Sequence, residues 1–281
     1  MRLLLTPFVL IGFLAAATPF LTGCSDYGYL ESVTVAGSTT ILPIAEVAAE
    51  KFVQSTPDAS VLVSGMGSSA GIEAVSTGTA DIGTSSRHLR PNESHDLVDI
   101  PIAYDGIAVI VNLSNPIDEL TTEQLRDIYG GAITNWREVG GDDIPIDLIN
   151  RDEASGTRDA FTEAVMDDTP FDVGAVILPG TGQVREVVTR SAGAIGYISV
   201  GFVSPRFGTN PVKALVIDGV DPTRENVGNG VYPISRTLHF FTLGEPDGLT
   251  KRYIEYVLSD AVQFGAVVDA GYIPVTWRGE E

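Results

Sequence analysis

Short apolar runs alternate with longer segments of helical apolar spacing along most of this chain. The runs that favour β-strands cover residues 33–36, 61–64, 107–111, 146–149, 194–198, 214–217 and 237–242. The segments that favour α-helices cover residues 41–52, 70–76, 122–129, 158–165, 183–189 and 249–258. This alternation predicts an α/β fold with mostly parallel sheets. No Pro-, Gly- or Ser-rich linker divides the chain, so we expect any lobes to be joined by strands that cross between them.

The N-terminus has the layout of a secretory signal peptide, with a charged start at Arg2 and an apolar run over residues 3–21. The run ends in Leu21-Thr22-Gly23-Cys24, which resembles the lipobox of bacterial lipoproteins, and Cys24 is the only cysteine. We therefore predict a signal peptide at 1–23, lipidation of Cys24 and a lipidated tether at 24–31. An uncleaved membrane anchor is the alternative, because the run is nearly long enough to span a bilayer. Either way, the rest of the chain is expected at the cell surface or in the periplasm, held at the membrane.

The charge balance excludes some classes of partner. The formal net charge is −20 at pH 7, which disfavours nucleic acid and anionic membrane surfaces as ligands. Exposed charges are screened beyond about 8 Å at physiological salt, so distant carboxylates need not repel a small anion. An anion site in this chain must therefore depend on local donors and dipoles.

Four turns share one design, in which hydroxyl residues and glycine stand between a strand-like run and a helix. These turns are Gly37-Ser38-Thr39-Thr40, Gly67-Ser68-Ser69-Ala70-Gly71, Gly83-Thr84-Ser85-Ser86 and Ser155-Gly156-Thr157. A helix start exposes unpaired N–H groups and a partial positive charge, and hydroxyls add further donors. A single such turn is typical of an ordinary helix cap. Four in one chain favour an anion site without settling it.

The fourth turn adds an arginine, because Arg151 follows the strand-like run 146–149 and precedes Ser155-Gly156-Thr157. A guanidinium offers a planar fork that matches two oxygens of a tetrahedral oxyanion. Ser155, Thr157 and the Gly156 amide could then serve the other oxygens. A surface arginine beside a capped helix is the alternative.

These motifs together resemble the phosphate-binding proteins of ABC phosphate transporters, from Val33 to near the C-terminus. The segments that carry the resemblance are Ala36-Gly37-Ser38-Thr39-Thr40 with Pro43, Gly67-Ser68-Ser69-Ala70-Gly71, Ala80-Asp81-Ile82-Gly83 with Ser85-Ser86-Arg87, residues 105–109, residues 120–129, Ile133-Thr134-Asn135-Trp136 with Gly140-Gly141, residues 151–157 and residues 193–197. The run through Asn135-Trp136 and the Arg-x-x-x-Ser-Gly-Thr run are specific, whereas the glycine-serine turns alone are not.

The resemblance implies the two-lobe fold of type II periplasmic binding proteins, with a ligand cleft between two α/β lobes. We expect lobe 1 at 32–105 and 233–281 and lobe 2 at 106–232. It also implies a monomer that captures inorganic phosphate, engages the permease subunits of an ABC importer, needs no cofactor and is not an enzyme. The phosphate ligands that it places on this chain are Thr39, Thr40, Ser68, Arg151, Ser155, Gly156 and Thr157.

One position departs from the family pattern. Where well-studied members have an aspartate that accepts a hydrogen bond from protonated phosphate, this chain has Ser86. A hydroxyl can donate or accept, so Ser86 alone cannot reject sulfate. We include Ser86 in the site and expect a carboxylate from elsewhere to act as the acceptor, first Asp105 and then Glu153. A turn residue is the alternative role of Asp105.

Other functions remain open at this point. The run 67–71 also matches the Gly-x-Ser-x-Gly nucleophile elbow, so a serine esterase using Ser69 is a remote alternative, with His239 and either Asp218 or Asp221 completing the triad. A binder of another tetrahedral oxyanion, or a phosphate sensor, is a nearer alternative. We expect no metal site, because the three histidines at 88, 95 and 239 lack ligand spacing.

Overall fold

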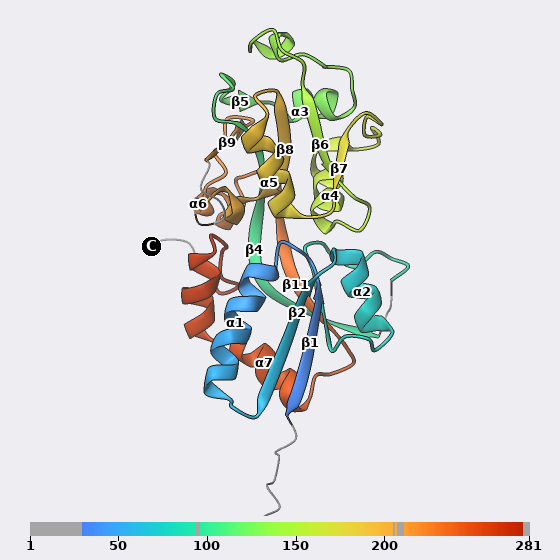
Figure 1. Ribbon diagram of the computed structural model, residues 1–281, viewed down its shortest axis with the longest axis vertical. Helices are drawn as coiled ribbons and strands as arrows, with labels where there is room; N and C mark the ends of the chain where they lie inside the picture. Colours follow the sequence, from blue (N-terminus) through green and yellow to red (C-terminus); the bar gives the residue numbers. More distant parts are fainter. Residues whose placement is uncertain (1–29, 94–95, 205, 207–210, 278–281) are drawn as a thin grey trace, which may run out of the picture.

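The computed structural model describes residues 30–93, 96–204, 206 and 211–277. Cys24 and the predicted signal peptide lie outside these residues. The chain forms two α/β lobes that are stacked along the long axis of the molecule (Figure 1). Among the described residues, none of the helices has both the length and the apolar character needed to cross a membrane.

The first lobe is built on parallel strands, because β1 pairs in parallel with β2 on one side and with β3 on the other. Its elements are β1 (Glu31–Gly37), α1 (Leu42–Ser55), β2 (Ala59–Gly65), α2 (Ser68–Ser76), β3 (Ile82–Ser85), the first part of β4 (Leu97–Asn112), β11 (Ser235–Leu243), α7 (Gly248–Val257) and a π-helical turn at Val262–Val267. The C-terminal helices from α7 onward therefore pack against the N-terminal part of the chain.

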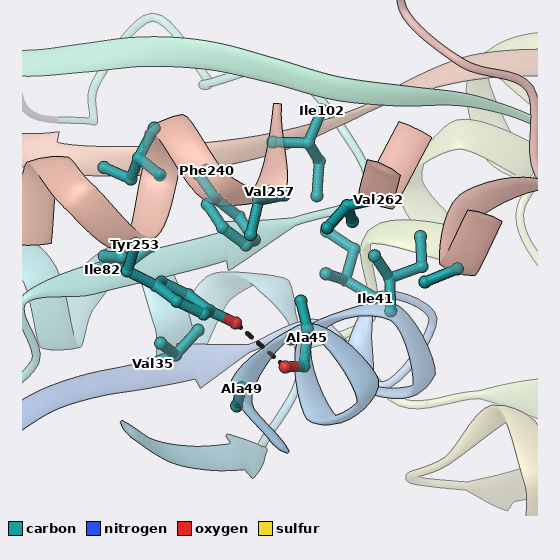
Figure 2. Packing of buried hydrophobic residues seen from close by; sticks show 14 of the residues in the cluster. Val35, Ile41, Ala45, Ala49, Ile82, Ile102, Phe240, Tyr253, Val257 and Val262 are labelled. Atoms are coloured by element: carbon teal, nitrogen blue, oxygen red, sulfur yellow. Dashed lines mark hydrogen bonds between the residues drawn. The ribbon is translucent and has the colours of Figure 1, made fainter. Parts of the chain in front are cut away.

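The core of this lobe lies between the sheet and the helices α1 and α7 (Figure 2). Val35 and Ile82 from parallel strands pack with Phe240 of β11 and with one face of α1. The hydroxyl of Tyr253 donates a hydrogen bond to the carbonyl oxygen of Ala45 at 2.9 Å, which joins α7 to α1 and satisfies a buried polar group.

The second lobe has β8 at its centre, parallel to β6 and antiparallel to β4. Its elements are β5 (Glu119–Leu120), α3 (Thr122–Tyr129), a 3-10 helix at Trp136–Val139, β6 (Asp147–Arg151), α4 (Gly156–Phe161), a π-helical turn at Thr162–Met166, β7 (Val176–Leu178), α5 (Thr181–Arg190), β8 (Ala194–Ser199), a 3-10 helix at Val200–Val203, β9 (Val212–Ala214), β10 (Val216–Ile217) and α6 (Arg224–Gly228). Two buried clusters, one on each side of this sheet, form its core.

Two strands, β4 and β11, join the lobes, as expected for a chain in which no linker-like sequence divides the lobes (Figure 1). Residues 97–106 of β4 pair with β11, and residues 107–111 of β4 pair with β8. The buried core changes from one lobe to the other between Ala103 and Ile107, and back between Ile234 and Leu238. The expected boundary at 105/106 lies within the first crossing, and the one at 232/233 lies just before the second; the exact lobe borders stay a prediction.

The sheet is mixed: β1 is parallel to β2 and β3, and β6 is parallel to β7 and β8, as expected, but the strands that join the lobes are antiparallel. β4 and β11 are antiparallel to each other and to their neighbours β8 and β3. A strand that passes from lobe to lobe must return, and the returning strand runs in the opposite direction. Alternation of strands and helices along the chain carries no signal for this return.

A candidate oxyanion site between the lobes

The turn before α1 carries Thr39 and Thr40 to the boundary between the lobes. Gly37 has φ +139°, and a Cβ at this position would lie 2.2 Å from the carbonyl oxygen of Thr84, so the turn requires glycine. Thr40 Oγ1 lies 3.2 Å from Thr157 Oγ1, a residue of the other lobe. The two hydroxyls therefore meet across the boundary.

The start of α2 brings a second hydroxyl to the same boundary. Ser68 is buried, and its Oγ accepts a hydrogen bond from the amide of Ser86 at 3.1 Å. The two Oγ atoms of this pair lie 3.3 Å apart. Opposite them is Gly156 of lobe 2, where a Cβ would lie 2.3 Å from Ser68 Oγ and 2.8 Å from Ser86 Oγ. The residue at 156 must be glycine for the lobes to approach this closely.

Arg151 lies at the end of β6 and is 1% exposed. Its Nε donates to the carbonyl oxygen of Leu178 at 3.1 Å, and its Nη2 donates to that of Pro179 at 2.7 Å. Nη2 also lies 3.5 Å from Thr39 Oγ1 of lobe 1. No carboxylate accepts from this guanidinium within the described residues, so its charge is available to an anion.

Burial lowers the pKa of Arg151 to about 10, because desolvation disfavours the charged form. The guanidinium still carries its proton at neutral pH. A buried cation held by neutral oxygen atoms favours an anionic ligand as its partner.

The segment after Arg151 supplies the remaining predicted residues. Ser155, Gly156 and Thr157 are buried at the start of α4. Ser155 Oγ accepts from the amide of Arg158 at 3.2 Å, so this hydroxyl caps the helix and keeps its own proton free to donate. Thr157 and Gly156 contact the hydroxyls of lobe 1 as described above, and Ser155 is the residue directly before them.

Comparisons with known proteins fit this arrangement. A model of the PBP superfamily domain matches residues 26–261. The phosphate-binding protein PstS of Bacillus subtilis is 37% identical over 87% of this chain and 81% of its own length. Among solved structures, a substrate-binding protein assigned to a phosphate ABC transporter of Clostridium perfringens, solved with bound phosphate, aligns with a TM-score of 0.83 and 39% identity over 88% of this chain and 100% of that one. An ABC-type phosphate transport receptor from Vibrio cholerae aligns with a TM-score of 0.71 and 35% identity over 86% and 99% of the two chains.

The chain belongs to the family of phosphate-binding proteins of ABC transporters. The two-lobe fold of type II periplasmic binding proteins, which the sequence motifs predicted, is confirmed by the same comparisons. This is a family of binding proteins rather than enzymes.

The residues of the rival esterase triad have other hydrogen-bond partners in the structure. Ser69 Oγ accepts from Arg87 Nη2 at 3.1 Å. His239 Nδ1 lies 2.6 Å from Asp99 Oδ1, whereas Asp218 accepts from Thr122 in lobe 2. The elbow-like sequence at 67–71 is therefore a helix start that contacts the other lobe, with the Ser69 amide donating to the carbonyl oxygen of Ala154 at 3.1 Å.

The two carboxylates expected to accept a hydrogen bond from protonated phosphate lie in different surroundings. Glu153 is exposed at the surface. Asp105 is fully buried, and its carboxylate is already engaged by Arg236 Nη2 at 2.8 Å and by the hydroxyl of Ser199 at 2.7 Å. Burial raises the pKa of Asp105, and its partners Arg236 and Ser199 oppose that rise.

Two polar residues of the site were missed in the sequence. Thr181 begins α5, and its Oγ1 lies 3.3 Å from Arg151 Nη1 and 3.2 Å from Thr39 Oγ1. A signal was present, since Gly180-Thr181-Gly182 repeats the glycine-hydroxyl design. Arg236 lies beneath the site, with Nη2 3.3 Å from Thr40 Oγ1. Its place at the start of a strand gave no comparable signal.

Proposed function

We propose that this protein captures inorganic phosphate outside the cytoplasmic membrane and delivers it to the permease of an ABC importer. The observation that carries the proposal is Arg151, a buried guanidinium whose hydrogen-bond partners are carbonyl and hydroxyl oxygens contributed by both lobes. The named relatives that bind phosphate support the choice of this ligand.

Phosphate is held in this proposal by donors from both lobes. Lobe 1 contributes Thr39, Thr40, Ser68 and Ser86, and lobe 2 contributes Arg151, Ser155, Gly156 and Thr157. The Arg151 fork takes two phosphate oxygens, and the hydroxyls with the Gly156 amide take the others. The ion replaces the hydroxyl–hydroxyl contacts across the boundary, such as Thr40 to Thr157, so binding converts weak neutral contacts into charge-assisted ones.

Closure of the lobes is stabilised at one side of the site by an ion-pair cluster. Arg87 of lobe 1 lies with its Nε 2.7 Å from Asp159 Oδ2 of lobe 2. Its terminal nitrogens donate to both oxygens of Glu93, at 2.7 and 2.8 Å. Arg90 Nη2 also donates to Asp159 Oδ2 at 2.6 Å. Opening of the lobes to release phosphate must break the contacts to Asp159.

Asp105 acts on the site through Arg236 in this proposal. Both of its oxygens are held by Arg236 and Ser199, and the guanidinium is the group that reaches Thr40. The carboxylate therefore limits how much positive charge the site presents to an anion. Binding of other tetrahedral oxyanions remains a second candidate, because no carboxylate of the described residues is hydrogen-bonded to Ser68 or Ser86.

The position of the only cysteine, after Leu21-Thr22-Gly23, supports lipid anchoring at Cys24. Membrane attachment would keep the monomer near its permease while the two lobes remain free to bind. Direct titration with phosphate and competing oxyanions tests the proposed function.

A further inference from the structure

Three side chains outside the oxyanion site meet on one face of lobe 1. His239 belongs to β11, Asp99 belongs to the neighbouring strand β4, and His88 lies in the segment after β3. The strand register brings them together, because Phe241 pairs with Asp99 and His239 pairs with Ser85. One ligand atom from each of the three lies within 4.8 Å of the other two. The two imidazole rings are 4.7 Å apart between centroids.

His239 is the fixed member of this cluster. Its side chain is 1% exposed, and the ring stacks on Phe241. Its Nδ1 lies 2.6 Å from Asp99 Oδ1, so Nδ1 is the ring nitrogen that can bind an ion together with Asp99.

We propose that His88, Asp99 and His239 bind a divalent transition-metal ion of the Zn²⁺ class. Two imidazoles and one carboxylate suit Zn²⁺, whereas Ca²⁺ and Mg²⁺ prefer all-oxygen sites. Zn–N bonds of about 2.0–2.1 Å in a tetrahedron separate the ligand atoms by roughly 3.3 Å. His88 and Asp99 are exposed, so their side chains can turn by the small amount needed while His239 stays in place.

The chain itself supplies three ligands, which leaves the fourth position to water. The metal joins the segment after β3 to β4 and β11, so its binding should stabilise the fold of lobe 1 against unfolding. Spacing in the sequence hid the site, because its ligands come from three segments that only the sheet register brings together.

Zn²⁺ titration of the purified, tag-free, chelator-treated protein by calorimetry tests the proposal, with thermal unfolding as a second readout. We expect one equivalent to bind, a higher Tm with Zn²⁺, and at least a tenfold loss of affinity in His88→Ala and in Asp99→Ala. Both side chains are exposed, so these variants should fold, and retained phosphate binding checks this. Glu50→Gln removes an exposed carboxylate on α1 of the same lobe and should bind Zn²⁺ like wild type.

Co²⁺ gives an independent check, because its visible absorption reports histidine coordination. We expect a band in the wild type that disappears in His88→Ala. Absence of Zn²⁺ binding overturns the proposal. Wild-type Zn²⁺ affinity in either variant also overturns it, since the ion would then occupy another place.

Discussion

The carboxylate of Asp105 and the guanidinium of Arg236 form a buried ion pair where β4 and β11 cross between the lobes. Asp105 Oδ2 accepts from Arg236 Nε at 3.0 Å and from Nη2 at 2.8 Å. The two residues are direct cross-strand partners. Because Nη2 also reaches Thr40 Oγ1, the pair connects the hinge strands to the oxyanion site.

We predict that Asp105→Asn raises sulfate affinity relative to phosphate affinity. The change leaves Arg236 without its carboxylate partner, so the guanidinium attracts any tetrahedral anion more strongly. It also removes the negative charge that would weaken the binding of a fully deprotonated anion. Breaking a buried pair costs about 3–5 kcal/mol, so the free energy of unfolding should fall by up to that amount. Calorimetry with both anions and urea unfolding measure the two effects. Asp118→Asn, at an exposed position, is the control. An unchanged phosphate-to-sulfate ratio would show that Asp105 is only structural.

We predict that Asp159→Asn speeds phosphate release. The change removes the charge that holds Arg87 and Arg90 across the boundary, and a hydrogen bond to a charged group contributes about 1.5 kcal/mol. The dissociation rate should therefore rise about tenfold, with a smaller effect on the association rate. Stopped-flow measurement with a fluorescent phosphate competitor tests this. Glu163→Gln, an exposed change in the same lobe, should leave the rate unchanged, and an unaltered rate in Asp159→Asn would contradict the role of this ion pair.

The ion-pair cluster around Arg87 and Glu93 also predicts that the free energy of unfolding depends on pH. Burial alone would raise the pKa of Glu93, but hydrogen bonds from Arg87 and from the Arg90 amide lower it overall. A carboxyl whose pKa is lower in the folded state stabilises the fold above its unfolded pKa, and this contribution is lost as the pH falls through the folded value. Unfolding measured between pH 3 and pH 6 should show a steeper loss of stability for wild type than for Glu93→Gln. If stability falls with pH equally steeply in wild type and in Glu93→Gln, Glu93 does not have this role. Glu46→Gln is the control.

Several elements were predictable because local rules and tertiary contacts agree. The helix expected at 122–129 is found at Thr122–Tyr129, where Thr121 Oγ1 accepts from the amide of Gln124 at 3.1 Å in a capping box. The structure also brings hydroxyl turns and Arg151 to the boundary between the lobes, and their role as phosphate ligands stays a prediction. Short sequence signals suffice where a cap or a turn fixes the backbone locally.

Long-range pairs could not be predicted in this way. Only residues 107–111 of β4 were expected, because its first part contains Asp99, Pro101 and Asp105, which conceal an apolar pattern. Asp105 and Arg236 are 131 residues apart, so nothing local links them. The sequence shows the charge of Asp105 and so predicts an acceptor, but it gives no sign that Arg236 already engages the carboxylate.

We predict that Cys24→Ser releases the protein from the membrane. Stable anchoring requires acyl chains on this residue, and its thiol is the only one in the chain. Fractionation of cells that express wild type and variant should find the wild type with membranes and the variant in the soluble extracytoplasmic fraction. Mass spectrometry that shows an unmodified Cys24 in membrane-bound protein would contradict lipidation.

The most direct test of the whole account is a calorimetric titration of Arg151→Lys and wild type with phosphate. We predict one phosphate per wild-type chain and a loss of about 2–5 kcal/mol of binding free energy in the variant, because lysine keeps the charge but lacks the bidentate fork. Arg190→Ala, an exposed change in the same lobe, should bind like wild type. The account is contradicted if wild type fails to bind phosphate, or if Arg151→Lys binds it within about threefold of the wild-type affinity.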